Sequence, residues 1–150
     1  MSKLLLFTSS FPFGEYEAYL ETEIIFLAKK FDKITIYPFF YKDKNMEMRK
    51  IPKNVEIINP ILPISKLQRI IIFLKKIFTS PCKSLFFKEF FEKKIFLSYE
   101  KLTKWILAFM NSVILCNSNQ FKMLKKKKNS IFYFWWGSNW ATALSFGLKE

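Results

Sequence analysis

The sequence predicts an α/β fold built around a parallel β-sheet, because a strand, a loop and a helix follow one another near both ends of the chain. Residues 3–8 (KLLLFT) are a short apolar run, typical of a strand buried on both faces of a parallel sheet. Residues 131–135 (IFYFW) are a second such run, followed by a turn at Gly137 and another helical pattern. We therefore expect a doubly wound parallel sheet in a single domain spanning residues 1–150.

The first strand leads through turn residues 9–14 into a helix that is predicted from Glu15 onward. Its apolar positions recur at helical spacing: Tyr16, Tyr19, Leu20, Ile24, Leu27 and Ala28. Glu15, Glu17 and Glu21 fall in the predicted first turns, where acidic side chains complement the helix dipole. The run Lys33–Pro38 reads as the next strand and completes a strand, loop, helix, strand unit.

Further elements follow in the order expected for such a fold. A third short strand is predicted at 55–60. Residues 97–128 predict one long helix or a broken pair, because their apolar residues share a face at helical spacing. The last helix is predicted over 140–150, with Ser138 or Asn139 as its N-cap.

Residues 64–97 predict two basic, aromatic-rich amphipathic helices. The first has one apolar face opposite basic side chains, made of Leu67, Ile70, Ile71, Leu74, Ile77 and Phe78. The second has an aromatic arc made of Phe86, Phe87, Phe90 and Phe91. Helices of this kind can cover a sheet, and they can also lie on a membrane surface with lysines beside anionic head groups. The pattern is compatible with both.

Composition excludes several classes of site. The chain has no histidine, which removes the commonest zinc ligand and the usual general base near neutral pH. Cys82 and Cys116 lack metal-site spacing, so a reduced cytosolic chain is the simplest interpretation. No apolar run reaches the roughly 18 residues that would span a bilayer. We expect no metal, no cofactor and no membrane span.

The net charge of +13 comes almost entirely from lysine, since Arg49 and Arg69 are the only arginines. The planar arginine fork suits base and phosphate recognition, whereas lipid head groups accept point charges. We therefore favour an anionic membrane surface as a partner and expect no nucleic acid. Biased codon usage would also enrich lysine and isoleucine, so part of the charge need have no specific partner.

Ligands of doubly wound sheets bind at the carboxyl edge of the strands. Gly14 and Gly137, two of only three glycines, are both predicted at this edge, where glycine permits positive φ or a close approach to a ligand. Turn geometry alone explains them equally well. Tryptophans near Gly137 suit a sugar ring, with its apolar faces and hydroxyl edges, or a packed core. No residue is assigned a catalytic role, because the start of a helix explains Glu15, Glu17 and Glu21.

Two motifs together resemble the N-terminal domain of GT-B glycosyltransferases, of the family 4 type that builds bacterial surface polysaccharides. They are residues 11–15 (FPFGE) with the acidic helix behind them, and residues 134–141 (FWWGSNWA). The resemblance implies a Rossmann-like domain that forms the acceptor-binding N-terminal half of a GT-B architecture. It implies that the first loop faces the donor diphosphate and the second lines the acceptor side. The substrate-binding residues would be Phe13, Gly14, Glu15, Trp136, Gly137, Ser138 and Asn139.

Enzymes of this family transfer a sugar from a nucleotide sugar, with retention and without a required metal, to a polysaccharide or lipid-linked acceptor. The resemblance thus implies a hexosyltransferase-like protein in the cytoplasm, peripheral at the inner face of the cell membrane. The C-terminal domain that binds the nucleotide-sugar donor in this family is absent from the sequence, so we expect a truncated chain that is inactive alone. The alternative is a non-catalytic, basic membrane-surface or protein-interaction module.

Overall fold

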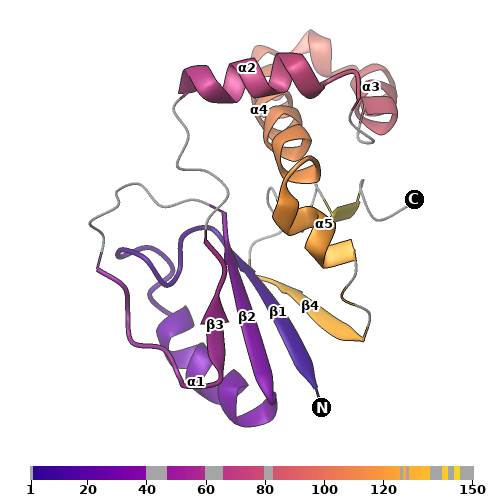
Figure 1. Ribbon diagram of the computed structural model, residues 1–150. Coiled ribbons are helices and arrows are strands. Elements are labelled where there is room, and N and C mark those ends of the chain that lie inside the picture. Colours follow the sequence, from indigo (N-terminus) through magenta and orange to yellow (C-terminus); the bar gives the residue numbers. More distant parts are fainter. Residues whose placement is uncertain are drawn as a thin grey trace. The chain divides into compact units, whose positions relative to one another are not determined.

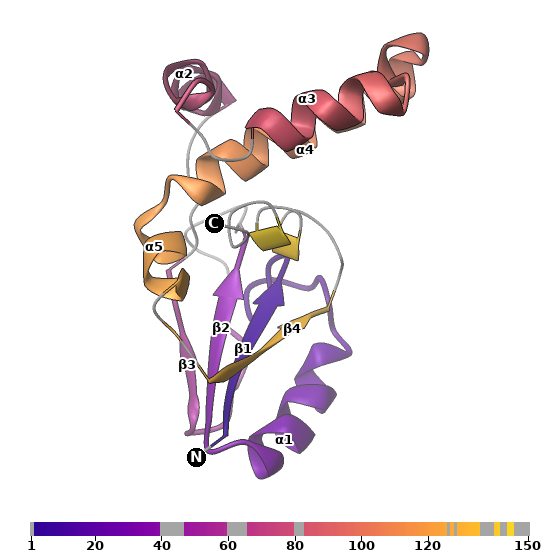
Figure 2. The ribbon, with the colours of Figure 1, turned by 90° about the vertical axis from the view of Figure 1, so that its right-hand side faces the viewer.

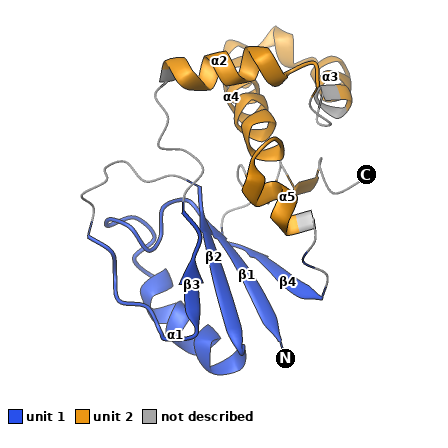
Figure 3. Cartoon of the chain, viewed as in Figure 1, with its two compact units in different colours: residues 1–63, 127–136 blue, residues 64–126, 137–150 orange. Residues whose placement is uncertain are grey.

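The computed structural model describes residues 2–39, 47–59, 66–79, 83–125, 127, 129–135, 140–141 and 144–145. The chain divides into two compact units, coloured separately in Figure 3. The first unit comprises residues 1–63 and 127–136, and the second comprises residues 64–126 and 137–150. Each unit has its own core, and each is described separately.

The first unit is built on a four-stranded sheet (Figure 1). Its strands are β1 (Lys3–Thr8), β2 (Lys33–Pro38), β3 (Val55–Ile57) and β4 (Ser130–Phe134). All neighbouring strands pair in parallel, in the order β3-β2-β1-β4. The α/β class and the parallel, Rossmann-like sheet are therefore confirmed, and β1 and β2 have the bounds that their apolar runs predict.

Helix α1 (Leu20–Lys30) lies along one face of this sheet (Figure 2). Alternate strand residues turn toward it because side chains of a strand point to opposite faces in turn. The resulting buried cluster joins three strands, α1 and the loop after β1, and it consists of Leu4, Leu6, Phe11, Leu20, Ile24, Ile34, Ile36 and Val55. Tyr133 and Trp135 at the β4 side pack against the same cluster.

The intervening strand residues form an aromatic row on the opposite face of the sheet. The ring of Phe7 stacks on Tyr37 of β2, with centroids 5.2 Å apart. It also stacks on Phe134 of β4 at 4.7 Å and on Phe132 at 5.8 Å. Stacked aromatic rings on neighbouring strands stabilise the pairing and its register.

Two details of this unit differ from the sequence predictions. Helix α1 begins at Leu20, because residues 16–19 form a turn and Glu17 has a φ of 59°, a left-handed value that ends any helix. Strand β4 is not fully buried, and Ile131 is exposed. It lies at an edge of the sheet, where one side of the strand has no neighbouring strand among the described residues.

The second unit is helical. Its elements are α2 (Lys66–Lys76), α3 (Lys83–Glu92), the 3-10 turn η1 (Ile95–Leu97), α4 (Tyr99–Cys116) and α5 (Asn119–Lys125). The broken helix pair predicted for 97–128 is thus confirmed. Phe109 of α4 packs edge-on against Phe73 of α2 and Phe87 of α3, and Trp105 one turn earlier contacts Phe90. These aromatic contacts hold α2 and α3 on α4.

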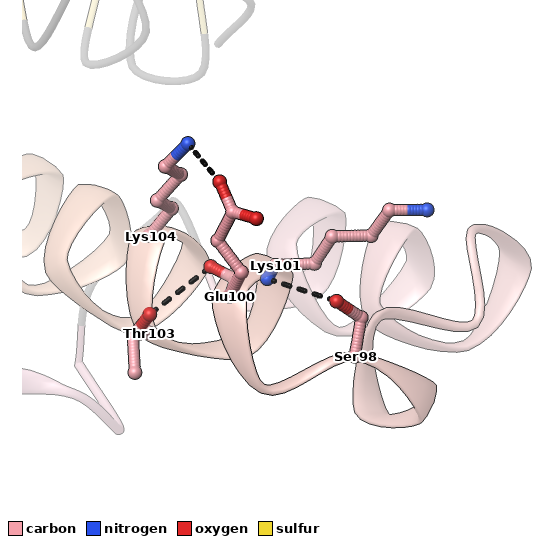
Figure 4. A network of polar contacts seen from close by, with 5 residues as sticks. All are labelled: Ser98, Glu100, Lys101, Thr103 and Lys104. Carbon is pink, nitrogen blue, oxygen red and sulfur yellow. Dashed lines mark hydrogen bonds and ion pairs between the residues drawn. The ribbon is translucent and has the colours of Figure 1, made fainter.

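Helix α4 begins with local polar contacts that Figure 4 shows. The Ser98 side chain caps the helix by accepting a 3.4 Å hydrogen bond from the backbone N–H of Lys101. Glu100 and Lys104, one turn apart, form an exposed ion pair with a distance of 2.6 Å. The Thr103 hydroxyl donates to the carbonyl oxygen of Glu100. These contacts all lie within the first turns of α4 and its N-cap.

Candidate functional site

The strand order places a topological switch point beside β1. The chain leaves β1 for β2 on one side, while β4 lies on its other side. In open parallel sheets the connections diverge at such a point and leave a crevice outside the carboxyl ends of the two strands, where ligands bind. The candidate site is therefore the edge formed by the loop that follows β1 and by the end of β4.

The loop of residues 9–14 is held by its own backbone and by the segment around Met48. The Thr8 hydroxyl donates to the Phe11 carbonyl at 2.8 Å, and the Phe13 N–H donates to the carbonyl three positions back in the turn at 2.9 Å. Phe13 forms an antiparallel bridge with Met48, and the Gly14 N–H donates to the Glu47 carbonyl. Gly14 has a φ of 69°, which glycine adopts without steric cost.

The Glu17 carboxylate occupies the centre of this loop. Oε1 accepts a hydrogen bond from the Ser9 N–H at 3.0 Å, and Oε2 accepts from the N–H groups of Ser10 and Phe11 at 2.9 Å each. Pro12 has no N–H, and the N–H groups of Phe13 and Gly14 donate to the carbonyl oxygens described above. Every backbone N–H from residue 9 to residue 14 is therefore engaged in a hydrogen bond. The loop thus carries an anion of its own where a phosphate-binding loop would offer amides.

Aromatic side chains flank the loop at the end of β4. The Trp135 N–H donates to the Phe7 carbonyl at 3.3 Å, which continues the pairing of β4 with β1 up to the edge. The Trp135 ring contacts Tyr19, with centroids 4.9 Å apart, and meets Tyr133 edge-on at 6.2 Å. A half-buried indole beside a half-exposed phenol forms an apolar surface with a polar rim.

Tyr133 is tied to helix α1. Its hydroxyl donates a 2.7 Å hydrogen bond to Glu23 Oε1. Burial, this hydrogen bond and the negative charge of Glu23 raise the pKa of Tyr133 to about 12. The phenol therefore stays protonated throughout the physiological range and acts as a fixed donor.

Arg49 lies on the other flank of the loop. Its guanidinium carbon is 5.9 Å from the centroid of the Phe11 ring, and its Nε is 4.0 Å from a Glu21 carboxylate oxygen. The backbone N–H of Arg49 donates to the Pro12 carbonyl, and this hydrogen bond fixes the backbone position from which the side chain extends. Among the described residues, the buried Arg49 Nη1 and the buried Ser10 Oγ have no hydrogen-bond partner. Buried polar atoms of this kind usually have one.

The structure brings part of the predicted site together. Phe13 and Gly14 lie half-buried in the loop, and Glu15 is exposed beside it. The other four predicted residues, Trp136, Gly137, Ser138 and Asn139, lie outside the described residues. Sequence reasoning did not single out Glu17, Tyr19, Tyr133, Trp135 or Arg49 for the site. Only Trp135 could have been found from the sequence, as the tryptophan that ends the predicted aromatic strand at 131–135.

Chemically, the described residues of this edge offer aromatic ring faces and buried polar side-chain atoms. Within the described ranges, no group of three or more histidine, cysteine, aspartate or glutamate side chains is placed to hold a metal ion. Across the helices that the structure describes, none combines the length and apolarity needed to cross a bilayer. Comparisons with protein-family models, with curated proteins and with solved structures find no significant match to this chain.

Proposed function

We propose that this chain is the acceptor-binding half of a retaining glycosyltransferase. In the reaction, the bond between the anomeric carbon and the diphosphate of a nucleotide sugar breaks, and a new bond forms to an acceptor hydroxyl oxygen. The nucleoside diphosphate and the hydroxyl proton are released. The proposal assigns the acceptor, a polysaccharide or a lipid-linked sugar, to this chain at the inner face of the membrane. It assigns the nucleotide-sugar donor to a further domain.

The observation that carries the proposal is the contact between Trp135 and Tyr19 at the switch point of the sheet. The axial C–H groups of a sugar ring form an apolar face that stacks on aromatic rings, while its hydroxyls need donors and acceptors nearby. Pockets that combine aromatic walls with a few placed polar groups are typical binding sites for small ligands. Arg49 and Ser10 add buried polar atoms on the far flank of the same loop.

In this proposal the loop of residues 9–14 contacts the ligand through its side chains and not through its backbone N–H groups. Its backbone donors from Ser9 to Gly14 are engaged inside the protein, three of them by Glu17. A diphosphate facing this loop would therefore find none of these backbone N–H groups free to donate to it. This arrangement favours a sugar acceptor over a phosphate as the group that the edge recognises.

The test is a titration of the isotope-labelled chain with soluble saccharide fragments and with a polyprenyl-linked sugar, followed by nuclear magnetic resonance. We expect the Gly14 amide and the Trp135 indole signal to shift together, with signals from α4 unchanged. A folded sample in which neither signal moves with any saccharide would remove the acceptor site from this chain.

A second candidate is a non-catalytic, basic surface-binding module. It rests on the distribution of charge, because residues 64–126 and 137–150 hold 14 lysines and arginines against 4 acidic residues. The rest of the chain holds 11 against 8. A net charge of +10 in one unit, against +3 in the other, is typical of contact with an anionic surface. Vesicle binding without any saccharide response at Trp135 would favour this second candidate over the acceptor-binding half.

A further inference from the structure

The apolar face of α2 points away from its own unit. Phe73 faces inward and contacts Phe109 of α4. At 100° per residue, Leu67, Ile70, Ile71 and Leu74 gather on one side of the helix, centred about 110° around its axis from Phe73. These four side chains, the α2 stripe, are 67%, 47%, 43% and 62% exposed. Amphipathic helices normally turn such a stripe toward the core.

We propose that the α2 stripe is a docking surface for an anionic lipid membrane, and that α2 lies in the interface with this stripe among the acyl chains. An interfacial helix needs an apolar side, basic residues near its margins and no long apolar run. Lys75 is exposed, and by helical geometry it flanks the stripe next to Ile71. No residue of α2 is acidic.

Charge identifies the lipid surface as the occupant. The helical unit carries a net charge of +10, so a second copy of the chain would bring a strongly repelling surface to the stripe. Its basic residues include a single arginine, Arg69, whose Nε is buried and lacks a hydrogen-bond partner among the described residues. Lysines attract anionic head groups as point charges, without the bidentate geometry that phosphate recognition in nucleic acids favours.

The inference is independent of the proposed transferase activity, because it concerns the helical unit and needs no bound sugar. It assigns one element, α2, where the sequence left open whether its apolar face covers a sheet or lies on a membrane. It also explains why large aliphatic side chains stand in the solvent on a helix whose other side is packed.

The test measures binding of the full chain to vesicles of phosphatidylcholine alone and of phosphatidylcholine mixed with phosphatidylglycerol. We expect binding only to the mixed vesicles. The double variant Leu67→Asn, Leu74→Asn should bind about tenfold more weakly. The matched control is Ile25→Asn, Phe26→Asn on α1, which replaces side chains that are 50% and 65% exposed and should bind like the unaltered chain.

A second pair of variants tests the charge without touching the apolar residues. Lys75→Gln should weaken binding to the mixed vesicles and reduce its dependence on salt, whereas Lys30→Gln in the last turn of α1 should change neither. Equal binding to both kinds of vesicle, or equal loss in the α2 variant and its α1 control, would overturn the inference. So would a dimer in light scattering that the Leu67→Asn, Leu74→Asn variant dissociates, because the stripe would then contact a second copy.

Discussion

Glu17 Oε2 accepts a 2.9 Å hydrogen bond from the backbone N–H of Ser10, so a side chain seven residues further along closes the loop that follows β1. The same carboxylate also binds the N–H groups of Ser9 and Phe11. Glu17 reaches them from a left-handed backbone position, which a residue with a Cβ adopts at some cost. The three charge-assisted hydrogen bonds offset this cost and fix the loop at the candidate site.

Removing this carboxylate should loosen the loop. We expect Glu17→Ala to lower the free energy of unfolding by about 2–4 kcal/mol, because two buried N–H groups and one part-buried N–H group lose a charged acceptor. Urea unfolding measures the change. Glu15→Ala is the matched control, since Glu15 is exposed two residues earlier and should change stability by less than about 0.5 kcal/mol. Equal effects of the two substitutions would show that the hydrogen bonds of Glu17 contribute little.

The same variant tests what the loop amides can bind. With Glu17 replaced by alanine, the N–H groups of Ser9, Ser10 and Phe11 form a vacant nest at the carboxyl end of β1. We expect inorganic pyrophosphate to shift the amide resonances of these residues in Glu17→Ala but not in the unaltered chain. A pyrophosphate response of equal size in both proteins would contradict the view that Glu17 occupies the nest.

Trp135 should provide most of the aromatic surface of the proposed acceptor site. Trp135→Ala retains the backbone hydrogen bond to Phe7 but removes the ring that contacts Tyr19. We expect the affinity for saccharide fragments to fall about tenfold, which corresponds to about 1.4 kcal/mol. Phe26→Ala on α1 removes another exposed ring of the same unit and should leave the affinity unchanged. An unchanged affinity for saccharides in Trp135→Ala would show that the binding site does not include this ring.

The sheet could be predicted from the sequence because its strands are continuous apolar runs bounded by turn residues. Residues 3–8 and 33–38 match β1 and β2, and no alternative period fits them. Glu17 could not be predicted, because a carboxylate near the start of a helix has the same sequence pattern whether it faces the dipole or folds back on a loop. Backbone φ decides between these cases, and composition does not encode it.

The helical unit shows a second feature that the spacing of apolar residues does not predict. The spacing of Leu67, Ile70, Ile71 and Leu74 reveals that they share a face, and this is confirmed. It does not reveal which side of α2 packs against α4. That choice depends on Phe73 and its contact with Phe109, 36 positions along the chain, and such a contact is visible only in three dimensions.

Tyr133 should lose its proton at a higher pH than an ordinary tyrosine. Its pKa of about 12 in the folded chain lies above the ordinary value of 10.0, so the protonated phenol is the form that the fold stabilises. This contribution is complete below about pH 10 and is lost as the pH rises through about 12. Absorbance at alkaline pH, compared between the unaltered chain and Tyr133→Phe, isolates its titration. We expect Glu23→Gln to lower the pKa of Tyr133, and an unchanged pKa would mean that burial alone sets it.

The Lys33–Glu56 ion pair should make the stability of the fold depend weakly on pH in the acidic range. Burial raises the pKa of Glu56, but hydrogen bonds from Lys33 and Thr35, with the charges of Lys33 and Lys127, bring it below the ordinary 4.5. A lowered pKa adds stability that is present above pH 4.5 and lost as the pH falls through the folded value. Both side chains are about half exposed, so solvent screening keeps this contribution small.

The sharper measurement is therefore the pKa itself, followed through the carboxyl carbon resonance of Glu56. We expect Lys33→Met to raise the pKa of Glu56, because the substitution removes both a 2.7 Å ion pair and a positive charge while Thr35 still donates at 2.7 Å. Lys30→Met is the matched control, since Lys30 forms no ion pair with Glu56 and should leave its pKa unchanged. A Glu56 pKa that is the same in both variants would mean that Thr35, and not the lysine, holds the carboxylate in its charged form.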